Sequence, residues 1–194
     1  TITRGGGSVV GGGINNTGTV NINNSTIANN SAIDDGGGIF NTGTVNISNS
    51  TIANNVAFFH GGGILNGGTV NISNSTIANN SATLLNGGGI NNTGTITIAQ
   101  SIVANNHAGL ILTSNCNGPL IDLGYNLENG MDCNFTGTSL QNTDPMLGPL
   151  TNNGGLTQTM ALLPGSPAID RIPPNVCLVP TDQRGVTRPQ GPAC

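Results

Sequence analysis

Apolar and polar positions follow short patterns that recur along the first half of the chain. In TVNIS (Thr44–Ser48) they alternate with the period of a β-strand, not of a helix. Two shorter strand candidates are TIANN and the G-I-x-N segment. Each is bounded by Gly, Asn or Ser, which are typical of turns. Glu, Lys, Arg and Gln, which favour helices, are nearly absent from this region. The pattern therefore predicts short strands joined by turns.

These patterns belong to one repeat. GGGI occurs at Gly11, Gly36, Gly61 and Gly87, so the copies are spaced by 25, 25 and 26 residues. A second block, which reads GTVNISNSTIANNSA from Gly68, follows each GGGI. Three short strands and three turns per repeat describe one coil of a solenoid, whose strands pair in parallel with their copies about 4.8 Å away. The predicted fold is all-β: a right-handed parallel β-helix with three-strand coils of about 25 residues.

Stacking the coils in register predicts both the core and the corners. The inward positions carry β-branched side chains, which are stiff and pack well on a pleated surface. They form four columns: Ile14, Ile39, Ile64 and Ile90; Val20, Val45, Val70 and Ile96; Ile22, Ile47, Ile72 and Ile98; Ile27, Ile52, Ile77 and Val103. Asparagine suits corners, because it tolerates the left-handed conformation and hydrogen-bonds in stacks. Its two columns are Asn29, Asn54, Asn79 and Asn105, and Asn30, Asn55, Asn80 and Asn106.

The repeats end before the chain does. We expect one continuous domain in which residues 1–108 form regular coils and residues 109–194 form irregular coils and a disulfide-pinned, proline-rich C-terminal cap. The first residues, TITRGGG, read as the middle of a repeat, so we expect further sequence upstream.

The four cysteines follow the repeats. They lack the close CxxC spacing of zinc sites, which favours two disulfides and an oxidising, extracellular setting. Three pairings are open. We favour Cys116 with Cys133 and Cys177 with Cys194, because each pair closes a short local loop.

Composition excludes several functions. The 194 residues include 31 glycines and 31 asparagines, only 6% are charged, and the net charge of −4 comes from eight acids and four arginines with no lysine. No basic patch is present to neutralise phosphates, so we expect no nucleic-acid partner. No apolar run approaches the 18 residues or so that a membrane span requires. We predict no cofactor and no metal site.

One corner carries a polar column. Aligned on the following GGG, Asp35 stacks beneath His60, with Asn86 above, which is a candidate site for a cation or a sugar. The Asp34–Asp35 pair near a histidine also resembles polygalacturonases, which are β-helix enzymes. Those enzymes need a further upstream Asp and a downstream Arg/Lys cluster, and this sequence has neither. A solvated turn is therefore the favoured interpretation, and we predict that the protein is not an enzyme.

The same corner also carries apolar residues in an otherwise polar turn. Phe58, Phe59, Leu84 and Leu85 are either a small cluster folded back on the solenoid or a contact patch for a partner. An outward column of Thr19, Thr44, Thr69 and Thr95 beside Asn21, Asn46, Asn71 and Thr97 is either a solvated sheet face or a surface for ice or polysaccharide. Between the last two cysteines, an Asp–Arg pair among Asp182, Arg184 and Arg188 is expected to pin an irregular tail, and a functional site is the alternative.

The C-terminal part resembles a known family. DPMLGPLTNNGGLTQTMALLPGSPAID (residues 144–170) and TDQRGVTRPQGPAC (residues 181–194) resemble the choice-of-anchor Q surface proteins of bacteria. NCNGPLIDLGYNLENGMDC (residues 115–133) is similar to the disulfide loop of that family. In these proteins a short D-I-G-x-[FY]-E segment and a cell-surface anchor follow. The resemblance implies secretion and surface display, and it implies no reaction.

These observations predict a secreted structural or adhesive protein of the cell surface. A solenoid needs capped ends, and the sequence shows no cap at Thr1. We therefore expect that the chain can stack head-to-tail with other copies of itself into a filament. The alternative is a glycan-binding module that uses an outward face. The expected partners are therefore a second copy of the chain or a cell-surface glycan.

Overall fold

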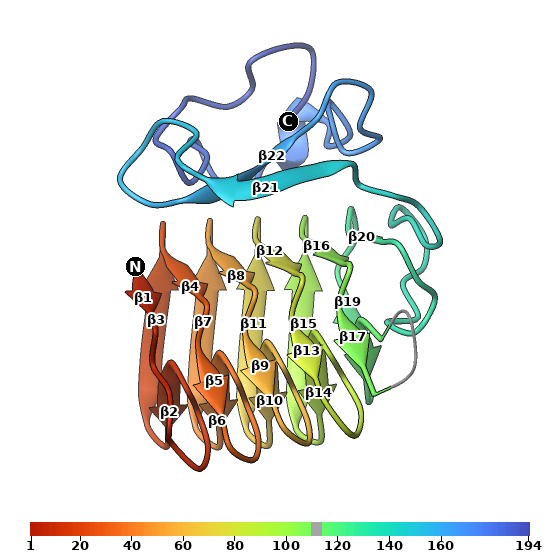
Figure 1. The fold of residues 1–194 in the computed structure, drawn as a ribbon. Coiled ribbons are helices and arrows are strands. Elements are labelled where there is room, and N and C mark those ends of the chain that lie inside the picture. Colours follow the sequence, from red (N-terminus) through yellow and green to blue (C-terminus); the bar gives the residue numbers. More distant parts are fainter. Residues whose placement is uncertain (110–113) are drawn as a thin grey trace.

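The structure, a computed structural model, describes residues 1–109 and 114–194. Its strands wind into a parallel β-solenoid of about five turns, which confirms the predicted all-β architecture (Figure 1). Residues 110–113, at the start of the predicted irregular part, lie outside the described residues. No helix in the described ranges has the length and apolar character needed to cross a membrane.

Equivalent positions of successive repeats pair with one another, so each predicted strand becomes one sheet along the solenoid. The GI sheet consists of β2 (Ile14–Asn16), β6 (Ile39–Asn41), β10 (Ile64–Asn66), β14 (Ile90–Asn92) and β18 (Cys116–Asn117). The TVN sheet consists of β3 (Thr19–Asn23), β7 (Thr44–Ser48), β11 (Thr69–Ser73), β15 (Thr95–Ala99) and β19 (Ile121–Asp122). The TIA sheet consists of β1 (Ile2–Thr3), β4 (Thr26–Ala28), β8 (Thr51–Ala53), β12 (Thr76–Ala78), β16 (Ile102–Ala104) and β20 (Leu127–Glu128).

The prediction of three strands per coil is wrong by one. A fourth sheet, the SA sheet, consists of β5 (Ser31–Ala32), β9 (Val56–Ala57), β13 (Ser81–Ala82) and β17 (His107–Ala108). The sharp corner at the left-handed Asn29 (φ 58°) is followed at once by another extended segment, whose small alanines are buried. Two residues per coil are too few to show an alternating pattern in the sequence, which is why the strand was missed.

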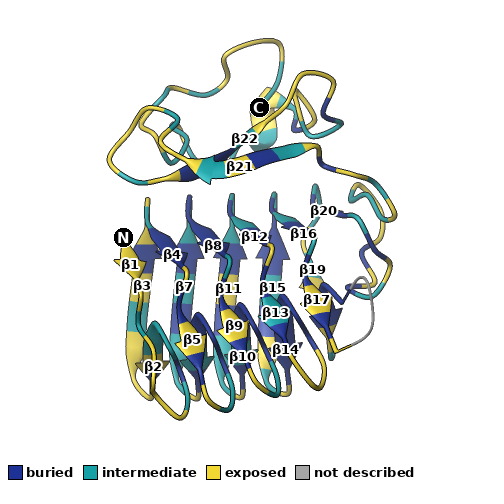
Figure 2. Ribbon diagram, in the orientation of Figure 1, coloured by how far each residue is buried: buried dark blue, intermediate teal, exposed yellow. Residues whose placement is uncertain are grey.

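The core is the predicted stack of β-branched columns. Ile39, Ile64 and Ile90 are fully buried, as are Ile52 and Ile77 on the TIA sheet (Figure 2). Parallel pairing holds these columns in register, as in Ile47 with Ile72 and Ile72 with Ile98. At the first coil Ile14 and Val20 are only partly buried.

The predicted corner chemistry is confirmed. Asn54, Asn79 and Asn105 adopt the left-handed conformation with φ of 58°. The next asparagine of each coil turns inward, and Asn55 Nδ2 donates to Asn80 Oδ1 at 2.9 Å while Asn80 Nδ2 donates to Asn106 Oδ1 at 3.0 Å. This inner asparagine ladder satisfies the polar groups of a corner that would otherwise leave them buried and unpaired.

The C-terminal residues divide between the end and the side of the solenoid. Residues 116–128 form the last coil with β18, β19 and β20, and residues 129–143, the covering segment, lie over it: Leu140 pairs with Leu127, and Phe135 packs into the core beside the Cys116–Cys133 disulfide. The hairpin β21 (Leu147–Thr151) and β22 (Thr159–Leu162) then runs back along the TIA sheet, followed by the 3-10 turn η1 (Pro174–Val176) and the tail (Figure 1). The second disulfide therefore lies beside the coils and not over their end, which differs from the predicted cap.

The side position has a physical reason. The TIA sheet faces outward with alanines, and Ala53 and Ala78 pack against Met160 of the hairpin, with Leu147 and Leu150 nearby. These alanines are fully buried. Covering a flat, small-residue face removes apolar surface from water, which stabilises the hairpin on it.

Candidate functional site

The polar column at the corner forms as the repeat alignment predicts. His60 lies directly above Asp35, with 2.9 Å between His60 Nδ1 and Asp35 Oδ1, and the His60 amide donates to the same oxygen at 3.0 Å. Asn86 follows on the next coil, where its backbone carbonyl accepts from Gly61 at 3.2 Å. The group is a carboxylate–imidazole pair in a partly exposed turn.

The apolar residues of that corner stay on the surface. Phe58 and Leu84 are 46% and 51% exposed, Leu85 is exposed as well, and Phe59 stacks edge-on against Phe58 with ring centroids 4.9 Å apart. Backbone hydrogen bonds from Leu84 to Phe58 and from Leu85 to Phe59 hold the two coils together there. The residues therefore form an exposed patch and do not fold back into a buried cluster.

The outward TVN face is a regular polar surface. Asn71 donates to Asn46, Asn46 donates to Asn21, and Thr97 donates to Asn71, each at 2.8 Å, and all of these side-chain bonds are exposed. The side chains of this face are therefore largely hydrogen-bonded to one another along the column.

Both predicted disulfides are present. Cys116 pairs with Cys133 at a Cα–Cα distance of 4.9 Å, and Cys177 pairs with Cys194 at 6.3 Å. The first closes the loop that covers the end of the core, and the second closes the tail.

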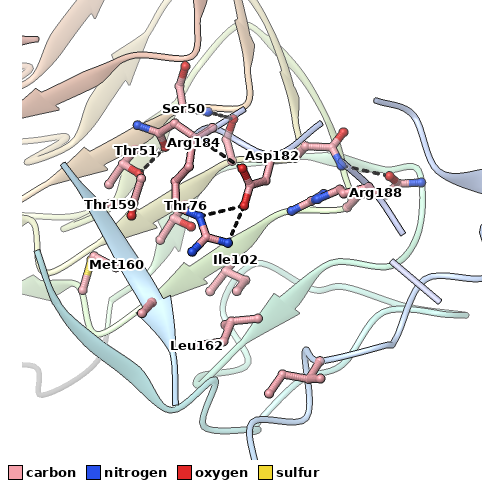
Figure 3. Close-up of a pocket in the computed structure, with 16 residues that line it drawn as sticks. Ser50, Thr51, Thr76, Ile102, Thr159, Met160, Leu162, Asp182, Arg184 and Arg188 are labelled. Carbon is pink, nitrogen blue, oxygen red and sulfur yellow. Dashed lines mark hydrogen bonds and ion pairs between the residues drawn. The ribbon is translucent and has the colours of Figure 1, made fainter. Parts of the chain in front are cut away.

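The strongest candidate site is a hollow of about 300 Å³ between the TIA sheet and the C-terminal tail (Figure 3). The solenoid side offers hydroxyls and amides: Ser50, Thr51, Asn74, Ser75, Thr76 and Gln100. Strand β22 forms one wall with Thr159, Met160, Ala161 and Leu162. The tail closes the other wall with Asp182, Gln183, Arg184 and Arg188.

Hydrogen bonds between tail and coils hold the hollow in shape. Gln183 accepts from the Thr51 hydroxyl at 2.7 Å and donates to the Thr26 hydroxyl at 3.1 Å. Asn49 donates to the Thr181 carbonyl at 2.9 Å. The repeated threonine column of the TIA sheet thus serves as the attachment line for the tail.

Asp182 organises the charged wall. Its carboxylate accepts from Arg184 Nε at 2.8 Å and from the amides of Arg184 and Val186 at 2.8 and 3.0 Å. Burial raises the pKa of Asp182, but these hydrogen bonds outweigh that effect and hold the pKa below its usual value. The Asp182–Arg184 pair therefore stays ionised and orders the turn at residues 182–186, while Gln183 and Thr181 attach the tail to the coils.

Arg188 is the second cation of this wall, and it differs from Arg184 in that no carboxylate pairs with it by a hydrogen bond among the described residues. Burial lowers the pKa of Arg188, the Asp182 carboxylate opposes this, and the positive charge of Arg184 adds to it. Among the described residues, its backbone amide donates to the Pro180 carbonyl at 2.8 Å, while its guanidinium makes no hydrogen bond to the protein. With one carboxylate and two guanidiniums, the wall carries an excess positive charge in a chain whose net charge is −4.

Sequence reasoning flagged Asp182, Arg184 and Arg188 but missed the hollow itself. The hollow was not predicted because it depends on the path of residues 144–194 along the coils, which no local sequence pattern encodes. Sequence reasoning also missed Glu128, in NLENG, although the repeat register indicates its position. Extending the register by one coil pairs Glu128 with Val103 in the inward column of the TIA sheet.

Comparisons with protein-family models, with curated proteins and with solved structures give no match.

Proposed function

We propose that this protein is a secreted, adhesive component of a cell surface that holds an acidic polysaccharide in the hollow beside its TIA sheet. The Arg188 guanidinium carries the proposal, because it is a partly buried cation in an open hollow with no hydrogen-bonded protein acceptor in the described chain. Arginine binds carboxylates in a bidentate, planar manner, so a uronic acid matches it.

The rest of the lining suits a sugar. The Thr76 hydroxyl lines the hollow and can exchange hydrogen bonds with sugar hydroxyls, while Thr51 and Gln100 are bonded to Gln183 and Val176 of the tail. Ile102 and Met160 add apolar surface for the faces of the rings. Thr51 and Thr76 occupy the same position on neighbouring coils, one strand spacing apart, and Ile102 takes this position on the next coil.

Two observations support an extracellular location at a cell surface: the disulfides and the resemblance of the C-terminal residues to surface proteins. Two disulfides within 194 residues are typical of proteins that fold outside the cytosol. The resemblance of residues 144–170 and 181–194 to choice-of-anchor Q surface proteins, with their right-handed β-helices, supports display on a bacterial surface. A rigid solenoid suits this role, since it presents its side faces at a fixed distance from an anchor.

Replacing Arg188 with glutamine should weaken binding to polygalacturonate by roughly tenfold to a hundredfold, because a charged hydrogen bond contributes about 1.5–3 kcal/mol. Affinity electrophoresis or calorimetry with polygalacturonate measures this, with neutral dextran as the ligand control. Arg4→Gln removes the same charge from the first coil and should bind like the unmodified protein. Equal affinity of the Arg188→Gln and Arg4→Gln variants, with both folded by thermal unfolding, would rule out the hollow as the binding site.

End-to-end stacking is the other structural role that the repeats suggest. The structure favours it less, because residues 129–143 cover the last coil, where Leu140 pairs with Leu127 and the Glu128 amide donates to the Leu140 carbonyl at 2.9 Å. A second copy would meet this covered end and not a free strand edge.

We therefore expect a single small species in sedimentation velocity, unchanged as the protein concentration rises. The physical reason is the missing strand edge, since a growing filament requires a contact that repeats without closing. A ladder of species, or fibres in electron micrographs, would show that the solenoids stack after all.

A further inference from the structure

Glu128 occupies a position where a charge is out of place. It lies on β20 in register with Val103, so it continues the inward column of Ile27, Ile52 and Ile77. Its side chain is 0% exposed. A buried carboxylate is costly unless a positive charge, hydrogen bonds or a proton compensates it.

A second carboxylate lies beside it. Oxygens of Glu128 and Asp132 lie within 4.8 Å of each other. The residues of the first disulfide hold both groups: the Cys133 amide donates to Glu128 Oε2 at 3.2 Å, and the Cys116 amide donates to Asp132 Oδ2 at 3.1 Å. The third group of this cluster, the Cys133 sulfur, is in the disulfide and cannot act as a thiolate ligand.

Each carboxylate keeps one oxygen free. Glu128 Oε1 and Asp132 Oδ1 are both buried and have no hydrogen-bond partner. Gly130 leaves the space next to them open, because a Cβ there would lie 2.9 Å from Asp132 Oδ1. Two buried oxygens of like charge with nothing donating to them define a place for a positively charged ligand.

The described chain provides no such charge. The pKa of Glu128 is raised to about 7, mainly by burial and also by the neighbouring Asp132, and no arginine or histidine is among the groups that shift it. The positive partner therefore comes from solution. Carboxylate oxygens are hard ligands, and Ca²⁺ accepts irregular sets of protein oxygens completed by water.

We propose that Glu128 and Asp132 bind a calcium ion that ties the covering segment to the last coil of the solenoid. Asp132 is only partly buried, so water molecules complete the coordination from its side. The ion takes the place of an apolar core residue in this column and links Glu128 on β20 of the last coil to Asp132 in the covering segment. This site is separate from the hollow and departs from the expectation, based on sequence, of no metal site.

The test is calcium titration of protein stripped with a chelator, followed by equilibrium dialysis and by thermal unfolding. We expect one bound ion per chain and, at about a hundredfold excess over Kd, a rise in Tm of roughly 5–10 °C. Glu128→Gln should abolish both the binding and the shift, and should raise the Tm of the metal-free protein, because it removes a buried charge.

Asp122→Asn is the matched control. Asp122 lies in the same segment, but its oxygens accept from Gly124, Asn126, Thr136 and Ser139, so its role is structural. This variant should lose stability and keep the calcium shift. If Glu128→Gln does not fold, Asp132→Asn provides the same measurement. Absence of bound calcium in the unmodified protein, or binding that survives both Glu128→Gln and Asp132→Asn, would overturn the proposal, as would stability that rises on acidification and ignores calcium.

Discussion

Replacing Asn80 with alanine should lower the free energy of unfolding by roughly 3–5 kcal/mol. Asn80 is fully buried in the inner asparagine ladder. Its Oδ1 accepts from the Asn55 amide and side chain at 3.0 and 2.9 Å, and its Nδ2 donates to the Ile52 carbonyl and to Asn106 at 3.0 Å each. The alanine variant loses all four bonds, leaves the buried Asn55 amide unpaired and opens a cavity, so the three coils joined at this corner lose stability together.

Asn71→Ala is the control, because it removes the same residue type from a ladder that is exposed. Asn71 donates to Asn46 and accepts from Thr97, both at 2.8 Å, on the outward TVN face. Water replaces these partners in the variant, so we expect a change within about 0.5 kcal/mol. Urea unfolding followed by far-ultraviolet circular dichroism measures both variants. Similar losses for the two would mean that the ladders stabilise through their regular stacking and not through burial of the amides.

The repeat made most of the fold readable from sequence. Each column is sampled four times, so a β-branched residue at one position, such as Val45, is supported by Val20, Val70 and Ile96. Internal repetition therefore served as evidence for register, and the structure pairs these residues as predicted. The corner asparagines were readable for the same reason, because their backbone requirement recurs in every coil.

The candidate sites lie where the repeat ends, and there the sequence is less informative. The hollow depends on a contact between Thr51 and Gln183, which are 132 residues apart, and no local pattern specifies such a pairing. Glu128 was the exception, since extending the register by one coil places it in the core. It was missed because the last coil is irregular, so that NLENG no longer resembles STIANN.

Replacing Gly62 with alanine should force neighbouring coils apart at that corner and lower the free energy of unfolding by about 3 kcal/mol or more. Gly62 is the middle glycine of its GGGI segment. A Cβ there would lie 2.4 Å from the backbone of Ser81 and 2.5 Å from the Gly88 carbonyl oxygen. Both obstacles are main chain of the next coil, which cannot rotate away as a side chain can, so the spacing between the coils would have to increase and break the hydrogen bond from the Gly62 amide to Gly87.

Gly67→Ala isolates this effect from the general consequence of adding a methyl group. Around Gly67 the nearest atoms to a Cβ are Asn41 O at 3.7 Å and Thr93 Oγ1 at 3.8 Å, which are ordinary contacts. The equivalent positions of the three other coils are Thr17, Thr42 and Thr93. Here alanine should stabilise the protein by about 0.4–1 kcal/mol, because it restricts the unfolded chain. Opposite signs in thermal unfolding would show that the middle glycines set how closely successive coils approach. A Gly62→Ala variant as stable as Gly67→Ala would mean that the coils separate at that corner without cost, and that the inner asparagine ladder alone sets their spacing.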